Sequence, residues 1–304
     1  DDPQLLSVLA SRDGGGALEA FLGLVPVTFS KLGERVDGAW LAMWTATPEA
    51  QARRVGLALL LAARERFPVL ACLGFNETAK RIYQAVDFTV RPLDRWVRIL
   101  DPDAVARLTA AGHEVGTDRL QTRDTSLDTL TSGVAIDPQG ARTEMDAELW
   151  NHAWQERFAP GLVGTWRDAD YLTRRYVEHP RFRYGVHAGN ALLVHRVEQP
   201  LGRDERVVRI VELLGDDGAL GSLVDAAEAA GAAFADFYCA GAGESAAMLE
   251  AAGFRREADL DAEVPSRLQP VEAGRTEIPL AIAGVDASAP LYVTRSDGDQ
   301  DRPN

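Results

Sequence analysis

Residues 40–88 read WLAMWTATPEAQARRVGLALLLAARERFPVLACLGFNETAKRIYQAVDF, and this stretch decides the fold. An apolar run, Gly38–Ala46, stops at Thr47-Pro48, and a polar loop leads into LALLLAARERF, whose residues are strong helix formers. A strand, a short loop and a helix N-terminus bind anions well, because the first N–H groups of the helix lack internal partners and the helix dipole is positive there. A second apolar run, Pro68–Gly74, precedes a second helix that begins near Asn76. The sequence therefore predicts a strand–loop–helix site suited to a pyrophosphate.

Two motifs in this stretch have the spacing of a known family. The loop Gln51–Gly56 reads QARRVG, with Arg54 where a glycine is usual, and residues 76–88 read NETAKRIYQAVDF, with Asp87 where a glycine is usual. In order and spacing they resemble the acetyl-CoA motifs of the GNAT superfamily of N-acyltransferases. Those motifs are Gln/Arg-x-x-Gly-x-Gly/Ala after the fourth strand and then Asn-x-x-Ala-x-x-(apolar)-Tyr-x-x-x-Gly-Phe.

The resemblance implies a site for acetyl-CoA or another acyl-CoA. Backbone N–H groups near the end of the strand would orient the pantetheine arm and polarise the thioester carbonyl, Asn76 would hydrogen-bond that arm, and Tyr83 would protonate the departing thiolate. The implied cofactor-binding residues are Trp44, Thr45, Ala46, Gln51, Arg53, Arg54, Val55, Gly56, Leu57, Ala58 and Asn76. The alternatives are an ordinary surface loop and a packing tyrosine.

Composition limits the possible functions. The 304 residues suggest about two domains, and the net charge of −14 argues against general binding to nucleic acid or an anionic membrane. Cys72 and Cys239 lie in apolar runs and indicate buried free thiols of a reducing compartment. With no signal peptide and no apolar run of about 20 residues, we expect a soluble cytoplasmic protein. The histidines have no ligand-like spacing, so no metal site is expected.

The chain order predicts an internal repeat. We expect a first domain at 1–100, a linker at 101–145 and a second domain at 146–304 with a polar C-terminal tail. In the first domain, two strands flank a glycine turn at Gly14–Gly16, and Arg91–Leu100 is expected to close the sheet. The second domain repeats the order hairpin, strand, helix, strand, helix, Gly-Phe, and ends it at Gly253-Phe254.

The predicted fold class is therefore α/β, with two tandem GNAT-like domains. Each has a mixed, mainly antiparallel central sheet flanked by helices, and the first domain lacks its leading strand and helices. In the second domain, Asp216-Asp217 would repel a pyrophosphate and Leu249 replaces the motif tyrosine. We therefore expect one acyl-CoA site, in the first domain.

A basic and aromatic cluster lies at Trp166–Tyr184, and arginine forks and aromatic faces suit a nucleotide. The alternative is an amphipathic helix with solvated arginines. The expected substrate-binding residues are Trp166, Arg167, Tyr171, Arg174, His179, Arg183 and Tyr184. With the tail at 291–304, this segment resembles a group of bacterial enzymes that acylate the amine of a nucleotide-linked amino sugar for surface polysaccharides.

Three functions follow as competing hypotheses. The first is acylation of a sugar-nucleotide amine by direct attack on the thioester, the second is acylation of another small amine, and the third is a non-catalytic scaffold that binds acyl-CoA. The general base is left open among Glu49, His179 and the tail aspartates. The acyl chain, the acceptor and the oligomeric state are not determined by the sequence.

Overall fold

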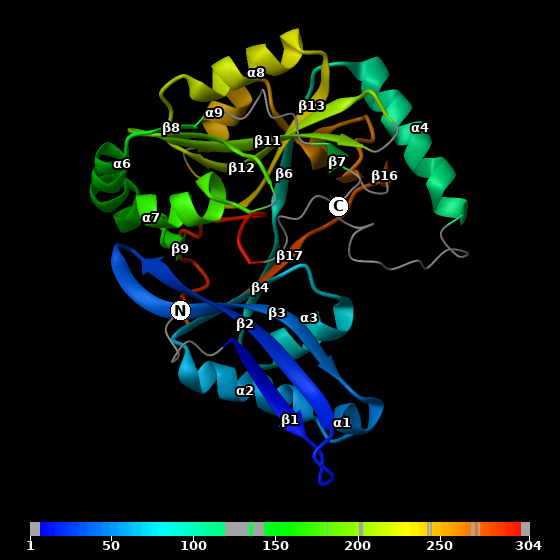
Figure 1. Cartoon of the computed structure of the whole chain (residues 1–304), viewed down its shortest axis with the longest axis vertical. Helices are drawn as coiled ribbons and strands as arrows, with labels where there is room; N and C mark the ends of the chain where they lie inside the picture. The colour runs from blue at the N-terminus through cyan, green and yellow to red at the C-terminus, as the bar shows by residue number, and fades with distance from the viewer. Residues whose placement is uncertain are drawn as a thin grey trace. The chain divides into compact units, whose positions relative to one another are not determined.

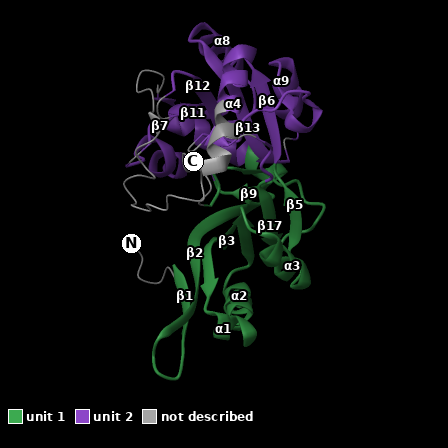
Figure 2. Ribbon diagram, turned by 90° about the vertical axis from the view of Figure 1, so that its right-hand side faces the viewer, with its two compact units in different colours: residues 1–93, 157–166, 278–301 green, residues 94–156, 167–277, 302–304 purple. Residues whose placement is uncertain are grey.

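The computed structural model describes residues 7–118, 134–135, 143–180, 182–200, 203–241, 243, 245–268, 271–272 and 274–298. It confirms the predicted fold class, because the chain forms two mixed, mainly antiparallel sheets flanked by helices. The chain divides into two compact units (Figure 2): unit 1 contains residues 1–93, 157–166 and 278–301, and unit 2 contains residues 94–156, 167–277 and 302–304. The expected boundaries at 100 and 146 differ from this division.

Unit 1 contains a seven-stranded sheet in the order β1-β2-β3-β4-β17-β5, with β9 paired to β2. Among the strand pairs that the structure describes in this sheet, β3 and β4 run parallel and the others are antiparallel. The unit's elements are β1 (Val8–Arg12), β2 (Leu18–Lys31), β3 (Glu34–Ala46), α1 (Pro48–Ala52), α2 (Val55–Arg66), β4 (Val69–Leu73), α3 (Glu77–Ala85), β5 (Thr89–Pro92), η2 (Ala159–Gly161), β9 (Val163–Thr165), β17 (Pro279–Ala283) and β18 (Val293–Thr294). The hairpin predicted around Gly14–Gly16 is confirmed as β1–β2.

The helices α2 and α3 of unit 1 cover one face of this sheet (Figure 1). Leu60 of α2 packs with Leu41 of β3, Leu70 of β4 and Ala281 of β17 in one buried cluster. The segments at 157–166 and 278–301 also belong to this unit: Trp40 Nε1 donates to Thr165 Oγ1 at 3.1 Å, and Thr165 in turn donates to Asp297 Oδ1 at 2.6 Å. Segments from far along the chain thus complete unit 1.

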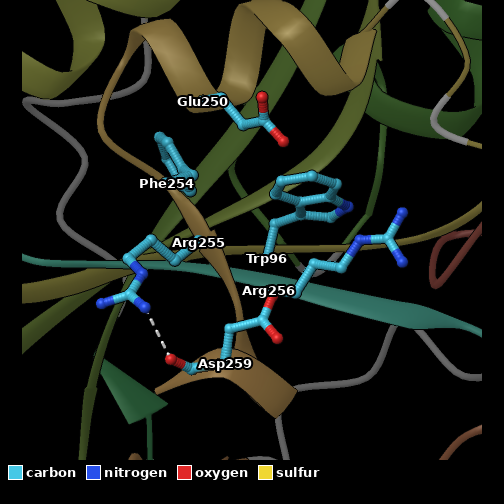
Figure 3. Close-up of a pocket in the computed structure, with 6 residues that line it drawn as sticks. All are labelled: Trp96, Glu250, Phe254, Arg255, Arg256 and Asp259. Carbon is cyan, nitrogen blue, oxygen red and sulfur yellow. Dashed lines mark hydrogen bonds between the residues drawn. The ribbon is translucent and has the colours of Figure 1, made fainter. Parts of the chain in front are cut away.

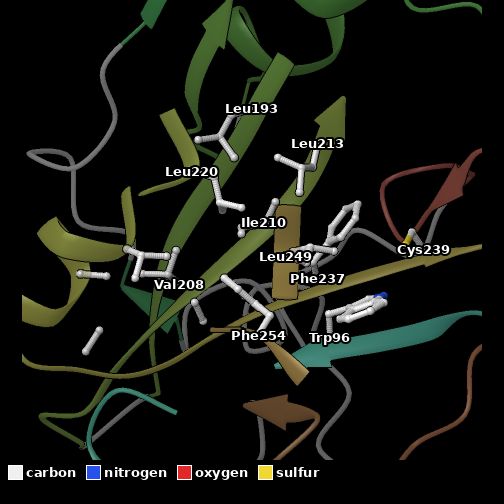
Figure 4. Packing of buried hydrophobic residues seen from close by; sticks show 14 residues of the cluster. Trp96, Leu193, Val208, Ile210, Leu213, Leu220, Phe237, Cys239, Leu249 and Phe254 are labelled. Carbon is white, nitrogen blue, oxygen red and sulfur yellow. The ribbon is translucent and has the colours of Figure 1, made fainter. Parts of the chain in front are cut away.

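Unit 2 contains a sheet in the order β14-β6-β13-β12-β11-β10-β8, with β7 paired to β11. Its elements are β6 (Asp94–Ile99), α4 (Pro102–Asp118), β7 (Val134–Ala135), β8 (Thr143–Met145), α6 (Ala147–Ala153), η1 (Trp154–Phe158, which crosses the unit boundary), α7 (Ala169–Leu172), η3 (Thr173–Val177), β10 (Gly185–Ala188), β11 (Leu192–Pro200), β12 (Arg206–Leu214), α8 (Ala219–Ala229), β13 (Ala232–Ala240), α9 (Ser245–Ala251), β14 (Arg255–Arg256), η4 (Glu257–Asp259), β15 (Arg267–Leu268) and β16 (Val271–Glu272). A cluster around Phe237, Leu249 and Phe254 forms the core beneath α8 and α9 (Figure 4).

The two units exchange one strand each, which the sequence did not predict. Arg91–Leu100 was expected to close the first sheet, but only β5 does so; β6 follows it directly and lies between β13 and β14 in the second sheet. The equivalent place in the first sheet, between β4 and β5, is filled by β17 from the C-terminal part of the chain. The physical reason is that β6 is buried on both faces, with Trp96 in one core cluster and Val97 in another, as an inner strand requires.

The segment expected to be a linker is partly structural. Helix α4 begins at Pro102, and its Leu108 packs with Phe234 of β13 in a second buried cluster of unit 2. Most of the remainder of 101–145 lies outside the described residues. Two short strands are described there: β7 pairs with the end of β11, and β8 pairs with β10.

A row of buried charges crosses the sheet of unit 2. Arg209 bonds to both Glu198 and Asp236 at 2.9 Å, and Asp236 also accepts from Arg95 at 2.8 Å. Alternating charged residues on strands usually indicate a solvated face, yet these side chains are buried. Mutual pairing offsets much of the desolvation that such burial requires.

Candidate functional site

The loop after β3 is held in place by its own side chains. Thr47 Oγ1 accepts from Ala50 N at 3.2 Å and caps α1, and Gln51 Nε2 donates to the Ala46 carbonyl at 2.9 Å. Arg54 then turns the chain with a left-handed φ of 60°, and α2 begins at Val55 without a side-chain cap. The first N–H groups of α2 therefore remain available to an external acceptor.

The strands β3 and β4 separate beside this loop. Their parallel pairing covers only Gly38–Leu41 and Val69–Cys72, and the register of β2 with β3 shifts opposite Gly23. Beyond Leu41, β3 therefore runs on to Ala46 with one edge not paired to β4. Backbone groups along that edge can be offered to a ligand.

A cavity of about 630 Å³ opens between the end of β3, the start of α2 and the start of α3. Its lining residues are Trp44, Thr45, Ala46, Gln51, Arg54, Gly56, Leu57, Asn76, Thr78, Ala79 and Ile82. The structure thus gathers most of the residues expected to hold the cofactor. Thr78, Ala79 and Ile82 were missed, although the motif helix that carries them was recognised.

Three expected cofactor residues lie outside this lining. Arg53 is exposed and forms an ion pair with the buried Glu19, which also does not border the cavity. Val55 and Ala58 belong to the same helix as Gly56 and Leu57 but are not among the residues that border the cavity. Their expected contact with the cofactor has no support in this geometry.

Asn76 has a structural role as well as a place in the cavity. Its Oδ1 accepts from Ala79 N at 2.9 Å and caps α3. Since a side-chain amide carries two N–H donors besides this oxygen, Asn76 can cap the helix and donate to a ligand at the same time.

Tyr83 is 1% exposed and lies in an aromatic cluster rather than in the cavity lining. Its ring centre is 4.9 Å from that of Phe75, 5.0 Å from that of Phe88 and 5.9 Å from that of Trp44. Burial, followed by the neighbouring Cys72 thiol, raises the pKa of Tyr83 well above its usual value. The phenol of Tyr83 therefore keeps its proton. The neighbouring Trp44 ring lies next to Tyr83 and also lines the cavity.

Gly56 owes its identity to a close approach. A Cβ at this position would lie 3.0 Å from Trp44 Nε1, so the indole of Trp44 packs directly over the first turn of α2. Glycine at this position therefore lets the Trp44 indole approach the helix closely.

The corresponding loop of unit 2 is filled by its own carboxylates. Asp216 Oδ1 accepts from Gly218 N at 2.9 Å, and Asp217 Oδ1 accepts from Ala219 N at 3.2 Å. Asp217 also bonds to His187 Nε2 at 2.6 Å, and Leu249 is buried at the position that Tyr83 holds in unit 1. Carboxylate oxygens here occupy N–H groups that a phosphate would need.

The expected basic cluster does not form one surface. Trp166 belongs to unit 1, under the Arg35 guanidinium at 4.7 Å. Arg167 is fully buried, its Nε 3.0 Å from both oxygens of Glu212, so it is unavailable to a phosphate. Tyr184 is also buried. The sequence could not show these pairings because Glu212 is distant along the chain.

The remaining members of the cluster are more accessible. Arg174 and Arg183 are exposed, and Tyr171 is partly buried. His179 stacks on Phe182 with ring centres 4.9 Å apart, and its Nδ1 accepts from Phe182 N at 3.0 Å. Arg181 lies outside the described residues.

None of the candidate bases that the structure describes borders the cavity of unit 1. Glu49 is exposed on α1, and Asp297 is buried, where it accepts from Thr165 and Thr294. Residues 299–304, with the other tail aspartates, lie outside the described residues.

Across the described ranges, no group of three or more His, Cys, Asp or Glu side chains is placed to hold a metal ion. Cys72 and Cys239 are both buried, as predicted, and are not joined in a disulfide. In the same part of the chain, no helix is both long and apolar enough to span a membrane.

Comparisons with known proteins return structural similarity only. No family model matches the sequence, and no curated protein matches it. Among solved structures, a GCN5-related N-acetyltransferase from Kribbella flavida is 14% identical with a TM-score of 0.46, covering 91% of this chain and 60% of that one. Saccharomyces cerevisiae N-myristoyltransferase with bound myristoyl-CoA is 9% identical with a TM-score of 0.43, covering 90% and 69%.

A third structure, Eis1 from Mycobacterium abscessus, is 16% identical with a TM-score of 0.42, covering 77% of this chain and 57% of that one. The chain therefore spans about three fifths of the length of the first structure it matches. Similarity at this level does not transfer an activity or a substrate to this chain.

Proposed function

We propose that the chain is an N-acyltransferase of the GNAT type, which binds acyl-CoA in the cavity of unit 1. The observation that carries the proposal is the convergence on that cavity of the uncapped start of α2, the unpaired end of β3 and the amide of Asn76. These are the donors that a pyrophosphate and an amide-rich pantetheine arm require.

Bound acyl-CoA would supply an activated thioester, and the chain's own groups would do the rest. Arg54 and the first N–H groups of α2 hold the negative charge, while backbone N–H groups of Trp44–Ala46 orient the arm and polarise the carbonyl. An unprotonated amine attacks the thioester carbon and loses a proton to water, the carbon–sulfur bond breaks, and the thiolate takes a proton from Tyr83, which regains one from water. Holding amine and thioester together supplies much of the rate enhancement.

Tyr83 is the proposed proton donor to the thiolate. Its raised pKa keeps the phenol protonated, and its ring neighbour Trp44 borders the cavity. Because the Tyr83 hydroxyl is buried, its proton reaches the thiolate only if Trp44 moves or if one water molecule bridges the two groups.

We further propose that the acceptor is the amine of a nucleotide-linked amino sugar, with its diphosphate held by unit 2. The support is that Arg174 and Arg183 are exposed, and that Tyr171 and His179 of the same stretch of chain are only partly buried. Guanidinium groups bind phosphate oxygens with two parallel hydrogen bonds, and rings offer stacking faces to a base.

The direct test is an assay of thiol release. The full chain is incubated with acetyl-CoA and, separately, with nucleotide-linked amino sugars, amino acids, aminoglycosides and peptide amines, and free CoA thiol is followed over time. We expect release above the hydrolysis background only with an amine present, and fastest with a nucleotide amino sugar. If thiol is released with other amines but not with nucleotide amino sugars, the chain is an acyltransferase but the proposed acceptor is wrong.

A second candidate function is a non-catalytic protein that binds acyl-CoA. Two observations favour it: Tyr83 is buried, and no His, Asp or Glu side chain borders the described cavity of unit 1. Saturable binding of acetyl-CoA by calorimetry, with no amine-dependent thiol release across the panel, would identify this function.

A further inference from the structure

The proposed chemistry of unit 1 leaves one donor in its cavity unused, the indole N–H group of Trp44. Trp44 is partly exposed near the end of β3, and it lines the cavity of about 630 Å³. Its Nε1 has no hydrogen-bond partner among the described residues, and the atom is not sealed from solvent. An indole N–H donates and cannot accept, so a water molecule or a ligand must satisfy it in this cavity.

The cavity beside β14 in unit 2 also has a tryptophan on its border, but that indole is sealed (Figure 3). Trp96 is 1% exposed and its Nε1 is buried, so a ligand beside β14 cannot reach this N–H group. Trp40 and Trp150 are buried as well, and each donates its indole N–H to a group of the protein. Trp44 differs from these three tryptophans because its donor lies in an open cavity.

The nitrogen of the Trp44 indole lies at the first turn of α2. A Cβ on Gly56 would be 3.0 Å from Trp44 Nε1 and 3.4 Å from its Cε2 and Cζ2, so Nε1 is the ring atom nearest to that position. Gly56 is the second residue of α2, and the first backbone hydrogen bond of the helix runs from Ala58 N to the Arg54 carbonyl. The indole nitrogen therefore lies beside backbone N–H groups that precede the first helical bond.

The neighbours of Trp44 hold the indole in this position. Its ring centre lies 5.9 Å from that of Tyr83, and Leu22 of β2 lies opposite Trp44 in the sheet. The ring packs against the buried cluster between the sheet and its helices, and the missing side chain of Gly56 admits it there. A donor that is already fixed beside a helix start loses little conformational entropy when it binds an anion.

The charged side chains around this cavity favour an anion. Arg54 lines the cavity, is exposed, and forms no ion pair with any residue that the structure describes. Its neighbour Arg53, by contrast, pairs with Glu19. Among the described lining residues there is no Asp or Glu that would repel a phosphate. The indole N–H thus lies near uncommitted positive charge.

We propose that Trp44 selects acyl donors that carry a diphosphate, through a hydrogen bond from its indole N–H to a phosphate oxygen held at the start of α2. This inference rests on the proposed binding of acyl-CoA in unit 1, and it adds a side-chain donor to the backbone groups named there. Hydrogen bonds to a charged acceptor are about twice as strong as neutral ones. A pantetheine thioester without phosphate gains nothing from this donor, so Trp44 is a specificity-determining residue.

The first test uses the full chain labelled with ¹⁵N, with CoA, inorganic pyrophosphate and pantetheine as probes. The six tryptophans give six indole N–H resonances, and that of Trp44 is identified by its loss in Trp44→Phe or, if that variant misfolds, by its contacts to Tyr83. We expect CoA and pyrophosphate to shift this resonance saturably, and pantetheine to shift it much less. The Trp40 resonance is the internal control and should not move, because its N–H group is buried and bonded to Thr165.

The second test separates the N–H group of Trp44 from its ring. Trp44→Phe should weaken CoA binding about tenfold, because a hydrogen bond to a charged acceptor is lost. The same variant should leave the affinity for pantetheine nearly unchanged, and calorimetry measures both. Phe75→Leu is the matched control: Phe75 packs on Tyr83 in the same aromatic cluster, has no N–H group in its side chain and does not line the cavity. It should leave the affinity for CoA nearly unchanged.

Three results would overturn the proposal. The first is a Trp44 resonance that stays in place at saturating CoA, which would mean that the phosphates lie elsewhere. The second is wild-type affinity of Trp44→Phe for CoA. The third is an equal loss of affinity for CoA and pantetheine in that variant, which would make the indole a packing group only.

These outcomes are distinct from a failure of the proposed function. If CoA binds and amine-dependent thiol release is seen together with any of the three results, the chain is an acyltransferase in which Trp44 does not select the donor. If CoA does not bind, the acyltransferase proposal is wrong and the pyrophosphate titration decides alone. A saturable shift of the Trp44 resonance with pyrophosphate then supports the indole as an anion donor, and an unmoved resonance refutes it.

Discussion

The helix that follows the central strand starts differently in the two units. In unit 1 the residue before α2 is Arg54 and the residue before Phe88 is Asp87, and both have left-handed backbones with φ of 60° and 61°. In unit 2 the corresponding residues are Gly218 and Gly253, with φ of 86° and 80°. A side chain strains this conformation and glycine does not. Unit 1 therefore holds the backbone shape of both motifs although two of their glycines are replaced, by Arg54 and Asp87.

The same two helix starts differ in what occupies their N–H groups. Neither α2 nor α8 has a side-chain hydrogen bond from its N-cap residue, but the start of α2 faces a cavity, whereas Asp216 accepts from Gly218 N and Asp217 accepts from Ala219 N, the first residue of α8. Unit 2 thus has glycine at both left-handed turns and carboxylates beside α8, while unit 1 has Arg54 and Asp87 at these turns and a cavity beside α2. The open helix start, rather than the glycines, is thus the feature on which the proposed anion site rests.

Breaking the exchanged strand of unit 1 should have the largest effect. A Cβ at Gly284, which follows β17 and has a φ of 85°, would lie 1.8 Å from the Pro68 carbonyl oxygen. Gly284→Ala should therefore lower the free energy of unfolding by about 3 kcal/mol or more and remove acetyl-CoA binding. Urea denaturation and calorimetry measure the two effects.

The matched control lies in α8 of unit 2. A Cβ at Gly221 meets nothing within 4 Å, so Gly221→Ala should stabilise the chain by about 0.5–1 kcal/mol. Equal stability of the two alanine variants would mean that β17 can leave the first sheet freely.

A negative charge at the open helix start should abolish cofactor binding. Gly56→Glu places a carboxylate beside the first turn of α2 and against Trp44, so we expect the affinity for acetyl-CoA to fall about a hundredfold or more. Gly221→Glu at the corresponding helix of unit 2 should have no effect. Titration calorimetry measures both, and two acetyl-CoA sites per wild-type chain would refute the assignment to unit 1.

Removing the hydroxyl of Tyr83 separates catalysis from packing. Tyr83→Phe should lower the rate of acyl transfer by about 10²–10⁴-fold with nearly unchanged acetyl-CoA affinity. Because its pKa is raised above the usual value of about 10, Tyr83 should not contribute a loss of activity as the pH rises to 10. If the Tyr83→Phe variant transfers the acyl group at the wild-type rate while the chemical step is rate-limiting, Tyr83 only packs in the core, as Leu249 does in unit 2.

The exposed arginines of unit 2 test the division of labour between the units. At least one of Arg174→Ala and Arg183→Ala should raise KM for a nucleotide amino sugar roughly ten- to a hundredfold, since an unpaired phosphate loses a charge-assisted hydrogen bond. Neither should alter KM for acetyl-CoA, and Arg267→Ala should alter neither constant. If both variants have the wild-type KM for the nucleotide amino sugar and an unchanged circular dichroism spectrum, these arginines are solvated surface residues and do not bind the acceptor.

Exchanging the turn residues should give the smallest effect. Asp87→Gly should raise the free energy of unfolding by about 0.5–1 kcal/mol by relieving the left-handed backbone. Gly253→Asp in unit 2 should lower it, because a Cβ there would also lie 3.2 Å from Arg98 Nη1. Urea midpoints measure both, and a destabilised Asp87→Gly variant would show that the Asp87 side chain stabilises its own turn.

Local sequence patterns predicted the strand, loop and helix around the cavity because those signals are local. Thr47-Pro48 ends β3 and caps α1, and Asn76 caps α3, as their residue types favour. The motif spacing then placed Gln51, Gly56 and Asn76 in one cavity.

Partners distant in the chain could not be predicted in this way. The pattern of β6 indicates a strand but not which sheet it joins, and Arg95 looks like a surface residue until Asp236 and Glu257 are seen beside it. The burial of Arg167 in the cluster at Trp166–Tyr184 was missed for the same reason, since composition does not show that Glu212 pairs with Arg167.

The exchange of β6 and β17 has a consequence for synthesis on the ribosome. The pairing of Leu280 with Leu73 joins positions roughly 200 residues apart, so the first sheet lacks an inner strand until the end of the chain has emerged. During translation the edges of β4 and β5 stay exposed, and such edges invite aggregation. A nascent chain arrested before residue 279 should thus need a chaperone to protect β4 and β5. This need persists although residues 51–88, which carry both motifs, have already been translated.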